Sequence, residues 1–312
     1  MAAGLNEGDL LLTSPNTFVA SSNVGLYQNA EVDFVDIDEK TYNMSPSALK
    51  DKLKTIKKTP KVIIPVHFAG QSCDMKEIRQ IAKDSIIIED CAHAIGGEYM
   101  GKKIGCLEYS DMAVFSFHPV KIITTGEGGM VVTNNKELYE KLILFRSHGI
   151  TRNKDLMNNK DMPAWYYEQI SLGYNYRMTE IQAGLGVSQM KRIEEFLIRR
   201  REIAKKYDEA FKNHDIITPY QDEKGISAYH LYPVQVNNRD RIFNNLRNKG
   251  ILVNLHYIPV YLQPHYQNIG FKQGLCPVAE SYYEKALSLP MFYSLTNENQ
   301  DIVIESLIKE LK

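Results

Sequence analysis

The chain has 312 residues, of which 44% are hydrophobic and 24% charged, and its formal net charge is −1. This is the composition of a globular protein with a large core, and the absence of a basic patch excludes a nucleic-acid binder, which needs clustered Lys and Arg to neutralise phosphates. The apolar runs are too short to cross a bilayer, no signal-peptide pattern opens the chain, and four scattered cysteines indicate neither a metal site nor a disulfide framework, so we expect a cytoplasmic protein.

The first two-thirds of the chain alternates between strand-like and helix-like segments. The strand-like segments are 9–13, 32–37, 61–66, 86–89, 113–117 and 129–133, and the helical patterns are 45–57, 74–83 and 137–147. This β-α-β rhythm predicts an α/β fold with a mainly parallel sheet and helices on both faces. The segment 86–89 is apolar without alternation, which predicts a strand buried on both sides.

A long helix is predicted to begin at Thr179, where T-x-x-Q forms a capping box with Gln182. Its expected buried stripe consists of Ile181, Leu185, Ile193, Phe196, Ile203 and Tyr207. The polar stretch that follows suggests a boundary between a large domain, 1–212, and a small α+β domain, 213–312. Within the small domain we expect strands at 231–236 and 252–256 and helices at 239–249, 278–287 and 298–311.

Asp90 directly follows the predicted strand 86–89. Ligands of parallel sheets bind at the carboxyl ends of the strands, so this carboxylate is expected at a binding edge. There it can pair with the protonated ring nitrogen of pyridoxal phosphate and keep the ring an electron sink. The alternative is an ordinary loop or capping aspartate. His93, three residues later, is by itself equally consistent with a core or surface histidine.

Lys121 lies in the segment S-F-H-P-V-K-I-I-T-T-G-E-G-G, between two predicted strands. A lysine held in a loop at a strand end can form a Schiff base when burial lowers its pKa and exposes its lone pair. The apolar neighbours Val120, Ile122 and Ile123 favour burial, whereas a solvated surface lysine is the alternative. An Asp at one strand end followed by a Lys at the next is more specific than either residue alone.

Five motifs occur in the order found in the DegT-type sugar aminotransferases, and the chain resembles that family over essentially its whole length. They are P-N-T-F-V-A-S (15–21), E-D-C-A-H-A-I-G (89–96), S-F-H-P-V-K-I-I-T-T-G-E-G-G (116–129), R-S-H-G-I (146–150) and G-Y-N-Y-R-M-T-E-I-Q-A (173–183). The resemblance implies the aspartate-aminotransferase fold, type I, and a pyridoxal phosphate cofactor.

The resemblance also implies roles for individual residues. Lys121 matches the lysine that binds the cofactor covalently, and Asp90 matches the partner of its ring nitrogen. His93 matches the contact to the ring hydroxyl edge, and Phe18 the aromatic that stacks on the ring. Ser116 matches a phosphate ligand, although a strand-end hydroxyl explains it equally well on physical grounds, just as a core position explains Phe18.

Asn175 matches a phosphate ligand donated by the neighbouring subunit, so the resemblance implies a homodimer with shared active sites. A turn-forming asparagine is the alternative. The substrate-binding candidates are His118, Arg177, His256 and Tyr257. Arg177 and its flanking tyrosines are equally compatible with dimer packing.

The implied reaction moves an amino group from L-glutamate to C4 of a UDP-linked 4-keto-6-deoxy sugar, as in pseudaminic acid biosynthesis. Alternatives are amination of another nucleotide-linked keto-sugar, such as a perosamine- or legionaminic-type substrate, and a non-catalytic remnant that binds sugar nucleotide. A further expectation concerns the residues that family members carry before the segment beginning here at Met1. They include a helix start that holds the cofactor phosphate. We expect weak cofactor binding from a chain that lacks them.

Overall fold

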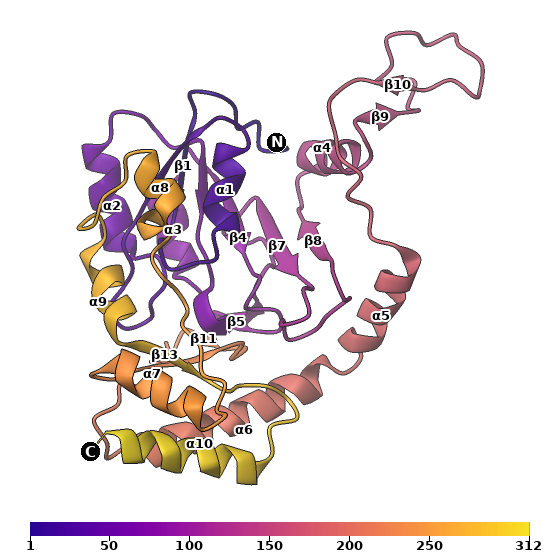
Figure 1. Ribbon diagram of the computed structural model, residues 1–312. Helices are drawn as coiled ribbons and strands as arrows, with labels where there is room; N and C mark the ends of the chain where they lie inside the picture. The colour runs from indigo at the N-terminus through magenta and orange to yellow at the C-terminus, as the bar shows by residue number, and fades with distance from the viewer. Residues whose placement is uncertain (312) are drawn as a thin grey trace.

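The computed structural model describes residues 1–311 and is built on one six-stranded sheet (Figure 1). In the order β2-β1-β3-β4-β7-β8, its strands are Glu31–Phe34, Leu10–Thr13, Val62–Ile64, Ile86–Asp90, Met112–Ser116 and Gly129–Val132. The first five are parallel, and β8 is antiparallel to β7. The predicted α/β class with a mainly parallel sheet is therefore confirmed.

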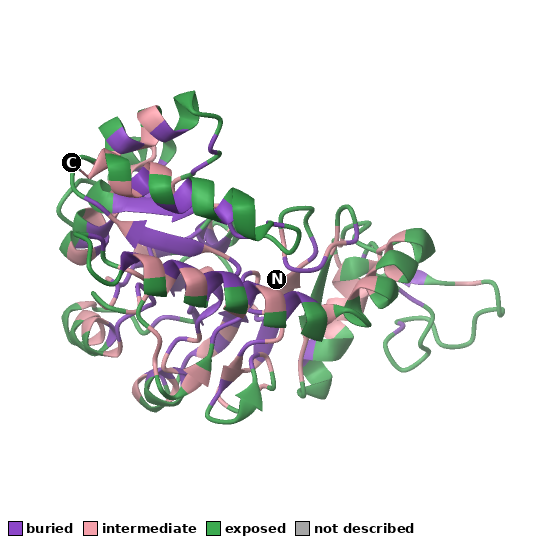
Figure 2. Cartoon of the chain, turned by 90° about the horizontal axis from the view of Figure 1, so that it is seen from below, coloured by how far each residue is buried: buried purple, intermediate pink, exposed green. Residues whose placement is uncertain are grey.

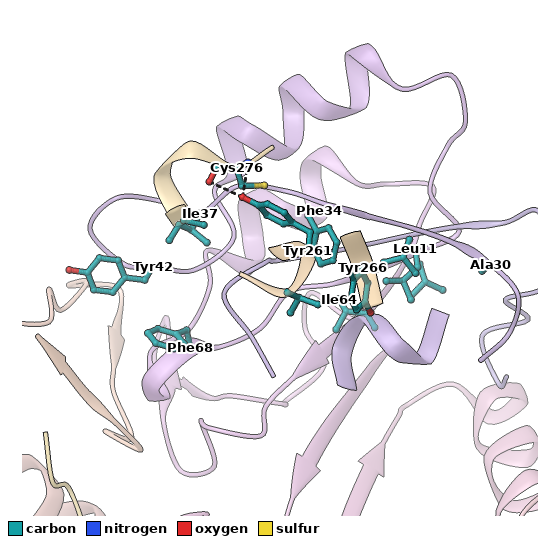
Figure 3. Packing of buried hydrophobic residues seen from close by; sticks show 14 of the residues in the cluster. Leu11, Ala30, Phe34, Ile37, Tyr42, Ile64, Phe68, Tyr261, Tyr266 and Cys276 are labelled. Atoms are coloured by element: carbon teal, nitrogen blue, oxygen red, sulfur yellow. Dashed lines mark hydrogen bonds between the residues drawn. The ribbon is translucent and has the colours of Figure 1, made fainter. Parts of the chain in front are cut away.

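Helices cover both faces of this sheet because successive side chains of each strand point to opposite sides. On β1, Leu10 and Leu12 pack in one core with α2 (Pro46–Thr55) and α3 (Met75–Ile81). Leu11 faces the other core, in which Phe34, Tyr261 and Tyr266 form an aromatic cluster (Figure 3). Three short helices supply the rest of that second layer: α1 (Ala20–Leu26), α8 (Pro264–Asn268) and α9 (Pro277–Lys285).

The predicted helix starts are confirmed by their caps. Ser45 Oγ accepts a hydrogen bond from the Ala48 N–H, and Pro46 is the first helical residue of α2. The Thr179–Gln182 capping box is present in both directions at the start of α5 (Glu180–Met190). In each case the side chain satisfies a backbone donor that has no partner within its own helix.

The long helix predicted from Thr179 is in fact two helices, α5 and α6 (Ile193–Phe211). The helix breaks at Arg192, whose φ of −107° and ψ of 3° are not helical. The predicted buried stripe is correct only for α6, because α5 has no buried residue and Ile181 is 87% exposed. The apolar face of α5 therefore has no partner within the described chain.

The second core joins α6 to β12 (Tyr232–Gln235), β13 (Ala286–Leu289), α7 (Arg239–Asn248) and α10 (Asn297–Glu310). The segment 252–256 is not the predicted strand, since only Asn254 bridges to Ser288. The predicted helix 278–287 ends at Lys285, and the chain continues into β13 instead. The division at 212/213 stays a prediction: α6 packs in the second core, while Tyr261 and Tyr266 pack against the main sheet.

Residues between β8 and α6 form an arm that stands away from the main body (Figure 1). It contains α4 (Lys136–Arg146), the short hairpin β9 (Ile150–Thr151) and β10 (Glu168–Gln169), and α5. Most of this arm is exposed, as its green colour in Figure 2 shows. The remaining short elements are β5 (Glu98–Tyr99), β6 (Lys102–Lys103), β11 (Gly225–Ile226), η1 (Phe68–Gly70) and η2 (Val260–Leu262).

Within residues 1–311, no helix combines the length and the apolar character that crossing a membrane requires.

Candidate active site

Asp90 is the last residue of β4, at the carboxyl end of the parallel sheet as predicted. Its two carboxylate oxygens are held separately: Oδ2 accepts from Ser21 Oγ at 2.6 Å, and Oδ1 accepts from the Ala92 N–H at 3.0 Å. The backbone is fixed as well, because the Asp90 N–H donates to Pro65 O at 2.9 Å. The carboxylate is thus oriented before any ligand binds.

Lys121 lies in the loop between β7 and β8 and is half-buried. Phe117 closes this loop, because its carbonyl accepts from Thr125 N at 3.0 Å and its N–H donates to Gly128 O at 2.9 Å. The neighbours Ile122 and Ile123 anchor the loop in a core cluster with Phe117 and α6. Val120, whose apolar side chain also suggested burial of Lys121, is itself 63% exposed.

The amine of Lys121 is suited to act as a nucleophile. Burial lowers its pKa, and the nearby Asp90 carboxylate offsets part of that effect. Among the hydrogen bonds and ion pairs of residues 1–311, none involves Lys121 Nζ. A lysine that is half-buried and without a direct acidic partner carries a larger neutral fraction than a surface lysine at the same pH.

His93 lies beside these two residues and is 5% exposed. Its Nε2 faces Tyr257 Oη at 3.2 Å, whereas its Nδ1 is buried without a hydrogen-bond partner among the described residues. Burial, with the positive charges of Lys121 and His256, holds the pKa of His93 well below its usual range. The imidazole is therefore neutral and offers one free nitrogen.

His256 and Tyr257 reach this site from the second half of the chain. The Tyr257 N–H donates to Asn16 Oδ1 at 3.1 Å, which fastens it to the loop after β1. His256 Nδ1 contacts Ser288 Oγ at 2.8 Å, and burial together with the charge of Lys121 lowers the pKa of His256 to about 4. Burial, and then the charge of Asp90, raises the pKa of the Tyr257 hydroxyl. Both predicted substrate-binding residues therefore lie near Asp90 and Lys121.

Three other candidates, Phe18, Ser116 and His118, come from the first half of the chain. Phe18 lies two residues before α1 and is 63% exposed, so it is not the core aromatic that the alternative required. Ser116 ends β7 and is partly buried, and its Oγ accepts from the His118 N–H at 3.4 Å. The side chain of His118 is exposed and lies 3.8 Å from Glu127.

Asn175 and Arg177 are not brought into the site of their own chain. Both are exposed on the arm, where Asn175 forms a bridge to Ser147. Their action on another subunit stays a prediction.

Two neighbours of the site were not predicted from the sequence. Ser21 holds Asp90, and His230 packs against His93 with 4.4 Å between the ring centroids. Both residues are far from their partners in the sequence, so no local pattern predicts these two contacts. The S-A-Y-H-L-Y-P-V context of His230 only indicates the start of a strand.

The buried group His67, Glu89 and Cys91 lies on the same strand end and has side chains of metal-ligand type close together. Its hydrogen bonds are already made: His67 Nε2 contacts Glu89 Oε2 at 2.8 Å, and His67 Nδ1 accepts from the Cys73 N–H at 3.0 Å. Since both ring nitrogens are engaged, this group is a hydrogen-bond network that ties β4 to the residues after β3.

The residues around Asp90 fit pyridoxal phosphate. The oriented carboxylate of Asp90 matches the basic ring nitrogen of this cofactor. Lys121, with its lowered pKa, matches the aldehyde carbon, and the unpartnered Nδ1 of His93 matches the ring hydroxyl. An orphaned polar atom in a buried setting indicates a missing polar partner, because an unmade hydrogen bond there is costly.

Comparison with known proteins agrees with this chemistry. The model of the DegT/DnrJ/EryC1/StrS aminotransferase family matches residues 1–308. A UDP-4-amino-4,6-dideoxy-N-acetyl-beta-L-altrosamine transaminase of Campylobacter jejuni is 36% identical over 100% of this chain and 81% of its own length. A GDP-perosamine synthase of Escherichia coli O157:H7 is 35% identical over 98% of this chain and 80% of its own length.

Among solved structures, the PLP-form of the candidate sugar aminotransferase Spr1654 from Streptococcus pneumoniae is 30% identical. It has a TM-score of 0.89, with coverage of 98% of this chain and 82% of the other. The expected PLP-dependent fold and cofactor are thereby confirmed. Family model, curated relatives and structural similarity together establish that this chain is a PLP-dependent sugar aminotransferase belonging to the DegT/DnrJ/EryC1/StrS aminotransferase family.

Proposed function

We propose that this aminotransferase moves an amino group from L-glutamate to C4 of a UDP-linked 4-keto-6-deoxy sugar, as in the biosynthesis of pseudaminic acid. The observation that carries the reaction type is the pairing of an oriented Asp90 with a half-buried Lys121 at the carboxyl end of the sheet. The substrate class is supported by the similarity to a transaminase named for an amino-dideoxy UDP-sugar.

In this proposal, each site residue acts on a defined part of the cofactor or of the reacting substrate. When bound, pyridoxal phosphate supplies an aldehyde that accepts the amino group and a ring that withdraws electrons. Asp90 holds a proton on the ring nitrogen, and Lys121 Nζ moves a proton to and from the reacting carbon. His93 Nδ1 contacts the ring hydroxyl, Phe18 stacks on the ring, and Ser116 Oγ binds the phosphate.

His118, Arg177, His256 and Tyr257 are proposed to contact the sugar nucleotide or the amino donor. The His256 imidazole lies near Lys121, and the Tyr257 hydroxyl contacts His93, so both are close to the residues proposed to hold the cofactor. Through His256 and Tyr257, the second half of the chain contributes to the site formed by Asp90, His93 and Lys121.

We propose further that two chains form a homodimer with shared active sites. The support is the arm, whose apolar residues are exposed over a continuous stretch of chain, including Trp165, Leu172, Tyr176, Ile181 and Val187. Large exposed apolar surface of this kind marks an interface. A second copy is the expected occupant because Asn175 and Arg177 lie on the same arm, and the resemblance assigns Asn175 to a neighbour's cofactor phosphate.

Trp165 provides a direct measurement of this interface. It is the only tryptophan of the chain and is 71% exposed. Burial against a partner should shift its emission to shorter wavelength as concentration rises, in step with the mass measured by light scattering. A monomeric mass at all concentrations, with unchanged emission, contradicts the dimer.

Amination of a different nucleotide sugar is the second candidate, supported by the 35% identical GDP-perosamine synthase. The test is mass spectrometry of products from a panel of UDP- and GDP-linked 4-keto-6-deoxy sugars with L-glutamate and pyridoxal phosphate. Amination of the UDP-linked sugars supports the proposal, whereas exclusive use of a GDP-linked sugar rejects it. A protein that binds the sugars but shows neither a visible cofactor band nor turnover would be the non-catalytic remnant.

A further inference from the structure

The ring of His230 packs against the ring of His93, which also contacts the Tyr257 hydroxyl. The two imidazole rings are 4.4 Å apart between centroids with an interplanar angle of 41°, and the residues are 5% and 6% exposed. The Nδ1 of each ring lacks a hydrogen-bond partner among residues 1–311. We infer that His230 is a positioning residue that holds the ring of His93 in one orientation and one uncharged tautomer.

The backbone that carries His230 is fastened to the turn after β3. The Ala228 N–H donates to Gly70 O at 2.9 Å, and the Leu231 N–H donates to Ala69 O at 3.3 Å. Gly70 has a φ of 108°, and a Cβ there would lie 2.6 Å from Tyr229 N. Only glycine allows this close approach, so the turn and the 228–231 segment meet at a fixed distance.

Arg200 of α6 fixes the same segment from the other side. Its Nη1 donates to the carbonyl oxygens of Tyr229 at 3.0 Å, His230 at 3.2 Å and Met291 at 3.1 Å. Burial lowers the pKa of Arg200 to about 10, so the guanidinium remains charged at neutral pH. A buried arginine that binds three carbonyls leaves the backbone of His230 little freedom to move.

Besides the neutral Tyr257 hydroxyl, the ionisable groups that act on the two imidazoles are basic, and of these Lys121 and Arg200 carry charge at neutral pH. Lys121 comes from the loop after β7, Arg200 from α6, and His256 from the segment before η2. Burial is the main reason why the pKa values of both His93 and His230 lie well below the usual range. The basic groups lower these pKa values further. The same charges disfavour a metal cation between the rings, so the pair is not a metal site.

This arrangement determines which nitrogen His93 offers. Nε2 faces Tyr257 Oη, so Nδ1 remains for a ligand. If His230 is shortened to alanine, water enters beside the ring and solvates the charged form of His93. His93 then titrates closer to its usual pKa, and its two neutral tautomers become comparable in population. A phenylalanine at 230 keeps the space filled and dry.

The test is NMR of protein labelled with ¹³C and ¹⁵N in histidine, without cofactor, with the His93 signals assigned by their loss in His93→Gln. In the parent protein we expect His93 to show one tautomer and a pKa well below its usual range. In His230→Ala the pKa of His93 should rise towards its usual range, with mixed tautomers. His230→Phe should resemble the parent, and so should His214→Ala, which removes an exposed histidine.

An unchanged pKa and tautomer of His93 in His230→Ala would overturn the inference. If that variant does not fold, the measurement on the parent protein decides. A His93 pKa near 6.5 there would show that the ring is not held in its uncharged form, and the inference would fail. The link from His93 to turnover rests on the proposed function, but the NMR result does not. A parent protein without aminotransferase activity, in which His93 does not titrate in its usual range and shows one tautomer, would reject the proposed reaction and leave the positioning role of His230 intact.

Discussion

Replacing Asp90 by asparagine removes one charge and leaves the local hydrogen bonds almost complete. The amide oxygen can take the place of Oδ1 and accept from the Ala92 N–H. The amide nitrogen then faces Ser21 Oγ, a hydroxyl that can rotate to accept instead of donating. Because the shape of the side chain is kept, we expect the fold to tolerate this substitution with little change in Tm.

The expected loss lies in the reaction rather than in stability. A hydrogen bond to a charged group contributes about 1.5–3 kcal/mol, against about 0.5–1.5 for a neutral pair. The carboxylate also stabilises positive charge on the ring nitrogen while the transition state forms, and losing one such oriented group costs about 3 kcal/mol. That energy corresponds to a decrease in rate on the order of a hundredfold.

The assay is the single-turnover rate of amino transfer from L-glutamate, followed by the absorbance of the cofactor at saturating pyridoxal phosphate. Ser21→Ala is the matched control: it keeps the charge of Asp90 and removes one of its two side-chain contacts, so the loss should be tenfold or less. A near-normal rate in Asp90→Asn, or an equal loss in both variants, would refute the assignment of Asp90.

Three further predictions concern the covalent site, the dimer and pH. Borohydride reduction of the loaded enzyme should label Lys121 alone in peptide mapping, and Lys121→Ala should abolish turnover with a normal circular dichroism spectrum; a label on another lysine contradicts this. Mixing Lys121→Ala with Asn175→Ala subunits should restore activity, because one site of each mixed dimer is whole; no recovery after verified subunit exchange counts against shared sites. The pKa of His256 is about 4 in the folded protein against 6.5 unfolded, so the unfolded chain takes up the proton first and stability falls as pH drops from 6.5 towards 4. His256→Asn should remove on the order of 3 kcal/mol of that loss in urea titrations, and an unchanged pH dependence would show that His256 is not the group responsible.

Local patterns in the sequence determined the elements and the chemistry of the main strand ends. Apolar runs specified β1, β3 and β4, and the cap residues Ser45 and Thr179 specified where helices begin, because these signals act within a few residues. Asp90 and Lys121 were identifiable for the same reason, since Asp90 directly follows a predicted strand and Lys121 lies in the loop between two of them. The motifs then allowed the resemblance to assign roles.

Only the tertiary structure decided which side chains are buried and which residues contact one another. The break at Arg192 and the exposure of Ile181 depend on what packs against the helix, which a periodic pattern does not reveal. Segment 252–256 has the composition of a strand, but only one residue finds a bridging partner. His230 packs against His93, which lies more than a hundred positions away in the sequence, and contacts from Gly70 and Arg200 fix its backbone there. Such long-range contacts depend on the packing of whole layers, so no local pattern encodes them.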